Sequence, residues 1–323
     1  MRGKAGRKRL YGVVRFNRRI LAFVLVAAVA AGLCTAAVAL HGADGADGTD
    51  AAINERQNPS ASPSVRPASE ETEGVEIPIV MYHSVLKDRA RLGKYVISPD
   101  EFESDLKYLK DNGYTTILME DLINYTQGGE LPEKPVLLTF DDGYYNNYLY
   151  AFELAKQYEA KFVISPIGFY ADQYTDTPDE NAYYSHATWP QLQEMRESGL
   201  VEIENHSYNL HKSNGSRLGV KKVSGETDAQ YEKMLTEDVL KAQEEIEGHV
   251  GVRPTTFVYP FGAVSKGTPE IIRKLGFTAT LSCEEHISTV TRDPESLFDL
   301  GRYLRVSGPS SEKFFEKTMK LKT

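Results

Sequence analysis

The chain has 323 residues and a formal net charge of −9 at pH 7. Because acidic residues outnumber basic ones, we expect no nucleic-acid partner. Its two cysteines, Cys34 and Cys283, lie in an apolar segment and far along the remaining chain, so the sequence predicts no disulfide framework.

The N-terminal region reads as a membrane anchor. Residues 1–19 are basic, and residues 20–40 form an uninterrupted apolar run without charge. About 20 such residues span a bilayer, and the basic flank is expected on the cytoplasmic side. A cleaved signal peptide with a small-residue site at Ala37-Val38-Ala39 is the alternative, but the run is longer than a usual signal core. We therefore expect a single-pass protein of the cell membrane.

The segment that follows is polar and small. Residues 41–74 are rich in Gly, Ala, Asp, Ser, Pro and Glu. Such a composition cannot bury enough apolar surface to offset the entropy of ordering, so we expect a disordered linker. A folded domain at residues 75–323 would then lie outside the cytoplasm, and its length of about 250 residues suits one α/β barrel.

Strand and helix patterns alternate through this domain. A helix is expected from Ser98, an N-cap residue before Pro99, to Gly113. Apolar runs that predict strands lie at 77–82, 115–119, 136–141, 161–165, 200–204, 255–259, 277–283 and 303–306. Further helices are expected at 148–158, 188–198, 228–248 and 269–275. This alternation predicts an α/β fold with a mainly parallel sheet, and the number of units favours a barrel.

Residues able to carry chemistry stand at the ends of three of these strands. His83 follows the first strand, Asp141 and Asp142 end the strand that begins at Val136, and His206 follows a later one. The carboxyl ends of parallel strands are where barrel active sites lie. Adjacent carboxylates repel unless a cation or a proton separates their roles. A metal on one carboxylate, with the other free as a base, would satisfy that requirement.

A second histidine, His211, lies five residues after His206. At that separation two side chains share a face neither on a helix nor on a strand. They can converge only if the chain turns after His206, which Asn209 would help. With Asp142 they would form a set of two histidines and one carboxylate, which is common in transition-metal sites.

Three motifs together resemble the polysaccharide deacetylases of carbohydrate esterase family 4. They are Thr139-Phe-Asp-Asp-Gly143, the pair His206 and His211, and Phe257-Val-Tyr-Pro-Phe-Gly262. The resemblance covers residues 77–306 and implies a distorted (β/α) barrel of seven units. Family members remove N-acetyl groups from chitin-like polymers, peptidoglycan or related glycans, and some remove O-acetyl groups from xylan.

The resemblance also implies roles for the motif residues. Asp141 would be the general base, and Asp142, His206 and His211 would bind a divalent metal, Zn²⁺ first, with Co²⁺, Mn²⁺ or Ni²⁺ as alternatives. A backbone N–H within Tyr259-Pro260-Phe261 would stabilise the oxyanion.

The chain departs from the family pattern in three places. The histidines are five rather than four residues apart, Val258-Tyr-Pro-Phe261 replaces a stretch that holds an arginine, and no histidine follows His286. The first of these features, with His83 after the first strand, resembles the branch that deacetylates poly-β-1,6-N-acetylglucosamine. We therefore predict that His83 is the general acid.

The arginine that orients the base is predicted in the closing strand, as Arg302 or Arg305, with Arg253 a weaker candidate. The other histidines, His41, His186, His249 and His286, are expected at the surface.

The leading interpretation is an anchored, monomeric N-deacetylase of an N-acetylglucosamine polysaccharide. An O-acetyl esterase on the same scaffold is one alternative, since the same attack by water cleaves an amide or an ester. A glycan-binding envelope protein without catalytic activity is another, supported by the missing family acid and arginine. Only an enzyme of this type should lose acetate release when its metal is chelated.

Overall fold

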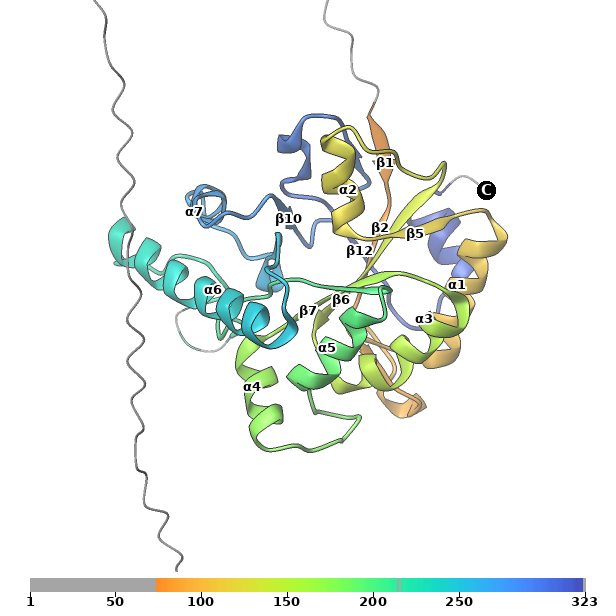
Figure 1. Cartoon of the computed structure of the whole chain (residues 1–323). Helices are drawn as coiled ribbons and strands as arrows, with labels where there is room; N and C mark the ends of the chain where they lie inside the picture. Colours follow the sequence, from red (N-terminus) through yellow and green to blue (C-terminus); the bar gives the residue numbers. More distant parts are fainter. Residues whose placement is uncertain (1–73, 214, 216, 322–323) are drawn as a thin grey trace, which may run out of the picture. The chain divides into compact units, whose positions relative to one another are not determined.

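The computed structural model describes residues 74–213, 215 and 217–321 (Figure 1). The predicted basic segment, the membrane anchor and almost all of the predicted linker lie outside these residues. Within the described part of the chain, no helix combines the length and apolar character needed to cross a membrane.

A parallel sheet forms the centre of the described fold. Its strands run in the order β12, β2, β6, β7, β8, and β5 pairs with the first part of β6. Their bounds are β2 Ile79–Tyr82, β5 Thr115–Ile117, β6 Pro135–Asp142, β7 Phe162–Pro166, β8 Val201–Ile203 and β12 Tyr303–Leu304. All of these pairings are parallel, as the predicted α/β fold requires.

Two isolated parallel bridges connect this sheet to a further pair of strands. β9 (Thr256–Val258) and β10 (Ala279–Leu281) pair in parallel. Asn205, just beyond β8, bridges to Phe257 of β9, and Leu281 of β10 bridges to Leu300, shortly before β12. Backbone pairing therefore continues from the end of β8 through β9 and β10 and returns to the segment just before β12.

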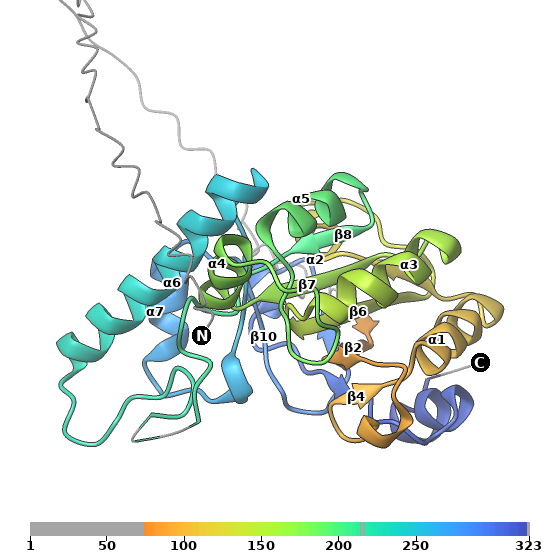
Figure 2. The same cartoon turned by 90° about the horizontal axis from the view of Figure 1, so that it is seen from below.

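Helices cover the strands on several sides. They are α1 Pro99–Asp111, α2 Met119–Thr126, α3 Glu153–Tyr158, α4 Gly168–Asp176, α5 Trp189–Glu197, α6 Asp228–Val250 and α7 Thr268–Lys274. A π-helical turn, Asn147–Phe152, precedes α3. Helices α6 and α7 lie on the opposite side of the strands from α1 and α3 (Figures 1 and 2).

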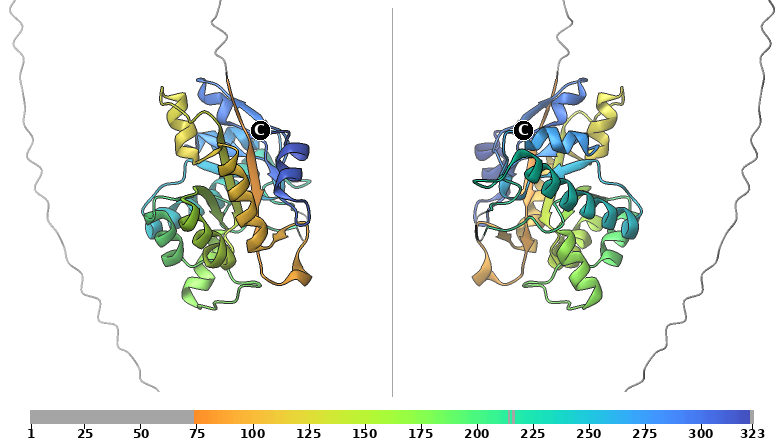
Figure 3. Two further views of the ribbon diagram at one scale, coloured as in Figure 1. Left: turned by 90° about the vertical axis from the view of Figure 1, so that its right-hand side faces the viewer. Right: turned by 90° about the vertical axis from the view of Figure 1, so that its left-hand side faces the viewer.

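Short strands join distant parts of the described chain. β1 (Val75–Ile77) pairs antiparallel with β11 (Ser288–Val290), and β3 (Ser84–Val85) pairs with β4 (Val96–Ile97). Figure 3 shows the orange strand β1 beside the blue C-terminal part of the fold.

The alternation of side chains along β6 separates two apolar clusters. Leu138 and Phe140 belong to a cluster with residues of α1 and α5. Leu137 belongs to a second cluster with residues of β9 and β10, such as Val258 and Leu281. Because successive strand side chains point to opposite faces, Asp141 lies on the same face of β6 as Leu137. The Asp141 side chain thus points to the inner side of the ring of paired strands.

Helices α2 and α4 were not predicted from the sequence. The strand expected at 115–119 ends at Ile117, and α2 begins at Met119. The amide N–H groups of Met119 and Glu120 donate to the carboxylate of Glu202, at 2.6 and 3.2 Å. Glu202 lies on β8, far away in sequence. Local sequence patterns therefore cannot predict the carboxylate that accepts hydrogen bonds from the first amide groups of α2.

Candidate active site

Asp141 is held by an arginine from the end of the chain. Arg302 Nη1 donates to Asp141 Oδ1 at 2.6 Å, and Nη2 donates to Oδ2 at 2.9 Å. Both side chains are buried. Burial alone would raise the pKa of the Asp141 carboxyl, but the charge of Arg302 and its hydrogen bonds hold that pKa well below its usual range. Asp141 is therefore an ionised, fixed carboxylate.

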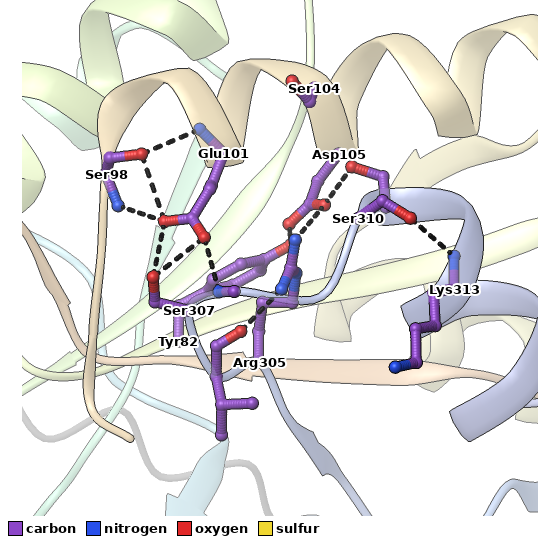
Figure 4. Close-up of polar contacts among 12 residues, drawn as sticks. Tyr82, Ser98, Glu101, Ser104, Asp105, Arg305, Ser307, Ser310 and Lys313 are labelled. Atoms are coloured by element: carbon purple, nitrogen blue, oxygen red, sulfur yellow. Dashed lines mark hydrogen bonds and ion pairs between the residues drawn. The ribbon is translucent and has the colours of Figure 1, made fainter. Parts of the chain in front are cut away.

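The other two arginines considered from the sequence contact different carboxylates. Arg305 donates from Nε and Nη2 to Asp105 on α1, at 2.9 and 3.1 Å (Figure 4). Arg253 pairs with Glu247, and both of these side chains are about half exposed. Of the three arginines, Arg302 is the one that contacts Asp141.

Asp142, His206 and His211 converge as the sequence predicted. Asp142 Oδ1 lies 3.6 Å from His206 Nε2 and 3.2 Å from His211 Nε2. The ligand atoms of the three residues all lie within 4.8 Å of one another. Asp142 and His206 are buried, and His211 is partly exposed, so one side of the group remains accessible.

The required turn after His206 is present. Ser207 has φ 71°, and its N–H donates to the side chain of Asn205 at 2.8 Å. The amides of Tyr208 and Asn209 donate to the carboxylate of Asp238 on α6, at 2.8 and 3.0 Å. Asn209 thus contributes through its backbone. A carboxylate from a distant helix fixes the turn that brings His211 back beside His206.

The three side chains fit a divalent metal. His206 Nδ1 lies 2.8 Å from the carbonyl oxygen of Val258, which can only accept, so Nδ1 carries the proton and the lone pair of Nε2 is directed at Asp142. Burial lowers the pKa of His206 to about 3, which keeps the imidazole neutral. Asp142 Oδ1 is buried and has no hydrogen-bond partner among the described residues. An unpaired buried carboxylate oxygen facing two imidazole nitrogens is what a cation would satisfy.

His83 lies in the same cavity as these residues. The cavity has a volume of about 630 Å³ and is lined by Asp141, Asp142, His206 and His211, and by Arg91, Lys94, Tyr95, Tyr144, Tyr183 and Phe261 among others. The His83 ring packs 4.9 Å from the Tyr95 ring, and its Nδ1 is buried without a hydrogen-bond partner in the described chain. The end of β2 therefore brings a histidine into the cavity that holds the carboxylate pair.

The predicted oxyanion group, Tyr259-Pro260-Phe261, is only partly supported. The N–H of Tyr259 donates to the carbonyl of Leu281 at 3.1 Å within the β9–β10 ladder, and its side chain lines a different cavity. Pro260 has no N–H. Phe261 lines the same cavity as His83, has φ 60° and packs its ring 4.1 Å from that of His211. Of the three, Phe261 is the residue beside the candidate metal ligands.

Two residues of the site were not identified from the sequence. His186, expected at the surface, is buried, and its Nδ1 lies 2.9 Å from the carbonyl oxygen of Asp142. Burial lowers the pKa of His186 to about 4. Cys283, considered only for disulfides, lines the cavity, with Sγ 3.8 Å from Arg302 Nη2. Neither residue belongs to a motif, so sequence patterns gave no signal for them.

Comparison with known proteins agrees with this arrangement. The family described as polysaccharide deacetylase matches residues 128–280. That range includes the carboxylate pair, the two histidines and Phe261, whereas His83 and Arg302 lie outside it.

Individual relatives extend the similarity over most of the domain. The chain is 27% identical over 259 residues to a poly-β-1,6-N-acetyl-D-glucosamine N-deacetylase of Escherichia coli (strain K12), a match that covers 74% of this chain and 38% of the relative. A protein of the same name from Staphylococcus aureus (strain MSSA476) is 27% identical over 199 residues, covering 60% of this chain and 63% of the relative. The chain thus matches less than two thirds of the length of either protein.

A solved structure shares the fold. The de-N-acetylase from Aggregatibacter actinomycetemcomitans superposes with a TM-score of 0.64 and 28% identity, covering 75% of this chain and 100% of that one. The motif order, the convergence of the motif side chains and these similarities lead to one assignment. The chain belongs to the polysaccharide deacetylase family.

Proposed function

We propose that the protein is a metal-dependent deacetylase that hydrolyses N-acetyl groups of an extracytoplasmic polysaccharide containing N-acetylglucosamine and releases acetate. This proposal rests on the different partners of two adjacent carboxylates. Asp141 is hydrogen-bonded to Arg302, and Asp142 faces the imidazoles of His206 and His211. The names of the relatives point to a β-1,6-linked polymer. The ring of paired strands fits the seven-unit barrel of the family.

The metal would be held by Asp142, His206 and His211, with Zn²⁺ the first candidate. When bound, such an ion supplies Lewis acidity toward water and the acetyl carbonyl. Two neutral imidazoles and one carboxylate leave room for water and substrate and suit Zn²⁺, Co²⁺, Mn²⁺ or Ni²⁺.

The chain's own residues supply the proton transfers. Asp141, kept ionised by Arg302, accepts a proton from the water that attacks the acetyl carbonyl carbon. The amide N–H of Phe261 is our candidate donor to the oxyanion that forms on the carbonyl oxygen. As the C–N bond breaks, His83 donates a proton to the departing amine, and acetate leaves. The oxygen of the water thereby ends in the acetate, and the nitrogen of the sugar gains a proton and becomes a free amine.

The ionised carboxylate at the base position, held by Arg302 beside the candidate metal ligands, favours this proposal over a binding protein without activity. An O-acetyl esterase remains the second candidate, since the same residues would serve an ester.

The experiment that tests the function is acetate release by the full-length protein. Substrates are β-1,6-linked N-acetylglucosamine oligomers, chito-oligosaccharides, peptidoglycan and acetylxylan, each with and without a chelator and added Zn²⁺ or Co²⁺. We expect release from an N-acetylated glycan that chelation abolishes and metal restores. Asp141→Asn should lower the rate by about 10²–10⁴-fold, the usual contribution of a positioned base. Release from acetylxylan alone would favour the esterase, and no release from any substrate would contradict both enzymes.

The proposed location outside the cytoplasm, on a single-pass anchor formed by residues 20–40, rests on the sequence alone. It is tested by following the full-length chain in membrane and soluble fractions and by adding protease to intact cells. A chain that is membrane-bound and digested from outside is expected. A chain that is protected from the protease would contradict this location.

A further inference from the structure

His186 lies behind the candidate metal ligand Asp142. The side chain is 8% exposed, and its Nδ1 lies 2.9 Å from the backbone carbonyl oxygen of Asp142. Because a carbonyl can only accept, His186 Nδ1 is the donor. Among the described residues, the other donor to this oxygen is the amide of Ile167, at the longer distance of 3.4 Å.

The segment around His186 is fastened along the turn that follows Asp142. The amide of Tyr145 donates to the carbonyl of Ser185 at 2.8 Å, and the amide of Ala187 donates to the carbonyl of Gly143 at 2.8 Å. Between these bonds, Tyr144 and His186 form an antiparallel bridge. The imidazole is therefore placed by backbone pairing on both sides of it.

Aromatic rings fix the plane of the imidazole. It stacks against Tyr170, with ring centroids 4.4 Å apart at 15°, and against Tyr144, at 4.7 Å and 29°. Tyr144 follows Asp142 by two residues, in the turn that is fastened to the His186 segment. His186 thus touches Asp142 directly through the carbonyl and packs on the turn after it through the ring of Tyr144.

Asp142 needs such support because its backbone is strained. Its φ is 69°, a left-handed conformation that is unfavourable for a residue with a side chain and persists only where the surroundings impose it. Small rotations about this backbone would swing Oδ1 away from the two imidazole nitrogens. The carbonyl bond from His186 opposes that rotation at the residue itself.

We propose that His186 is a positioning residue that holds the backbone of Asp142 so that its carboxylate meets His206 and His211 as a metal site. The inference rests on the proposed metal-dependent function. It predicts that the Nδ1–H donor, more than the volume of the ring, determines metal affinity.

Two substitutions separate the donor from the ring. His186→Phe keeps an aromatic ring against Tyr170 and Tyr144 but removes the donor. His186→Asn removes the ring but keeps an N–H at a position close to Nδ1. His286→Phe is the matched control, because His286 is exposed and belongs to neither group of candidate metal ligands in the described chain. Each is made in the full-length chain and measured for Zn²⁺ affinity by chelator competition, for the Co²⁺ absorption spectrum, and for thermal unfolding.

We expect His186→Phe to weaken Zn²⁺ binding by about 10–100-fold, the usual effect of losing a group that orients a ligand, and to alter the Co²⁺ spectrum. His186→Asn should retain most of the affinity despite a lower unfolding temperature, and His286→Phe should match the wild type. Wild-type affinity in His186→Phe would overturn the inference alone. If His186→Phe does not fold, the Zn²⁺ affinity of His186→Asn becomes the test. A loss of 10-fold or more in that variant would overturn the inference. A wild-type protein that binds no metal would instead remove the proposed function on which it rests.

Discussion

Arg302 donates hydrogen bonds to both carboxylate oxygens of Asp141, from Nη1 at 2.6 Å and from Nη2 at 2.9 Å. The two residues are 161 positions apart in the sequence, and both side chains are buried. Arg302 is itself fixed, since its Nε donates to the carbonyl of Ser282 at 2.8 Å. The residue directly before β12 thereby supplies the group that orients the proposed base.

Replacing Arg302 by lysine should impair turnover far more than substrate binding. Lysine keeps the positive charge but cannot bond both oxygens in one plane. We expect kcat to fall about 100-fold, at the lower end of what a positioned base contributes, with KM little changed. Steady-state kinetics on a soluble N-acetylated oligomer measure both constants. Arg253→Lys, at a pair that is about half exposed, is the control and should leave them unchanged.

A double substitution tests whether Arg302 works through Asp141. Once Asp141→Asn has removed the base, Arg302→Lys should add little further loss, because residues in contact act as a unit. Independent losses that multiply in the double variant would show that Arg302 serves another step.

Replacing His83 by asparagine should affect substrates according to their leaving group. An amine must be protonated to depart, whereas an activated aryl alcohol departs without an acid. We expect the rate of amide deacetylation to fall by about 10²–10⁴-fold, while hydrolysis of an aryl acetate ester falls much less. His286→Asn should change neither rate. Equal losses on both substrates would contradict the role of His83 as acid.

Gly143 should tolerate no side chain. Its φ is 72°, and a Cβ there would lie 2.8 Å from Cα of Pro166. Gly113 has a similar φ of 77° with nothing within 4 Å, so Gly113→Ala measures the cost of the conformation alone. We expect Gly113→Ala to lower the free energy of unfolding by about 1–2 kcal/mol. Gly143→Ala should cost clearly more and should weaken metal binding at Asp142. Urea unfolding measures both, and equal costs would show that the clash is relieved elsewhere.

Glu101 should make stability depend on pH. Its carboxylate accepts from the amides of Ser98, at 2.8 Å, and Gly308, at 2.8 Å, and from the hydroxyl of Ser307, at 2.9 Å (Figure 4). Partial burial alone would raise the pKa of Glu101, but these hydrogen bonds lower it below its usual value. Because the folded-state pKa is lowered, this stabilisation is present above the unfolded pKa of about 4.3 and is lost as the pH falls through the folded-state value.

The measurement is the urea midpoint between about pH 6 and about pH 3. We expect the wild type to lose stability below about pH 5 more steeply than Glu101→Gln, whose amide does not titrate there. Asp100→Asn, at an exposed carboxyl of the same helical turn, should follow the wild type. Parallel curves for Glu101→Gln and the wild type would contradict this role.

The sequence alone determined the features that depend on neighbours in the chain. Ser98 is the expected N-cap of α1, and the apolar run before Asp141 is the buried strand β6. Asp142 and His206 meet as expected, because strand ends in a parallel sheet lie at one edge, whereas His211 joins them through a turn whose amides donate to the distant Asp238. These inferences need only local periodicity, cap chemistry and motif order.

Only the tertiary structure decided which distant groups meet. Arg302 and Arg305 are three residues apart in one strand region, yet one contacts Asp141 and the other Asp105. His186 belongs to no motif and was expected at the surface, but backbone pairing with the turn after Asp142 buries it. Helix α2 starts where Glu202 of β8 accepts its first amides. In each case the deciding contact joins residues far apart in sequence, and the pattern around either one contains no sign of its partner.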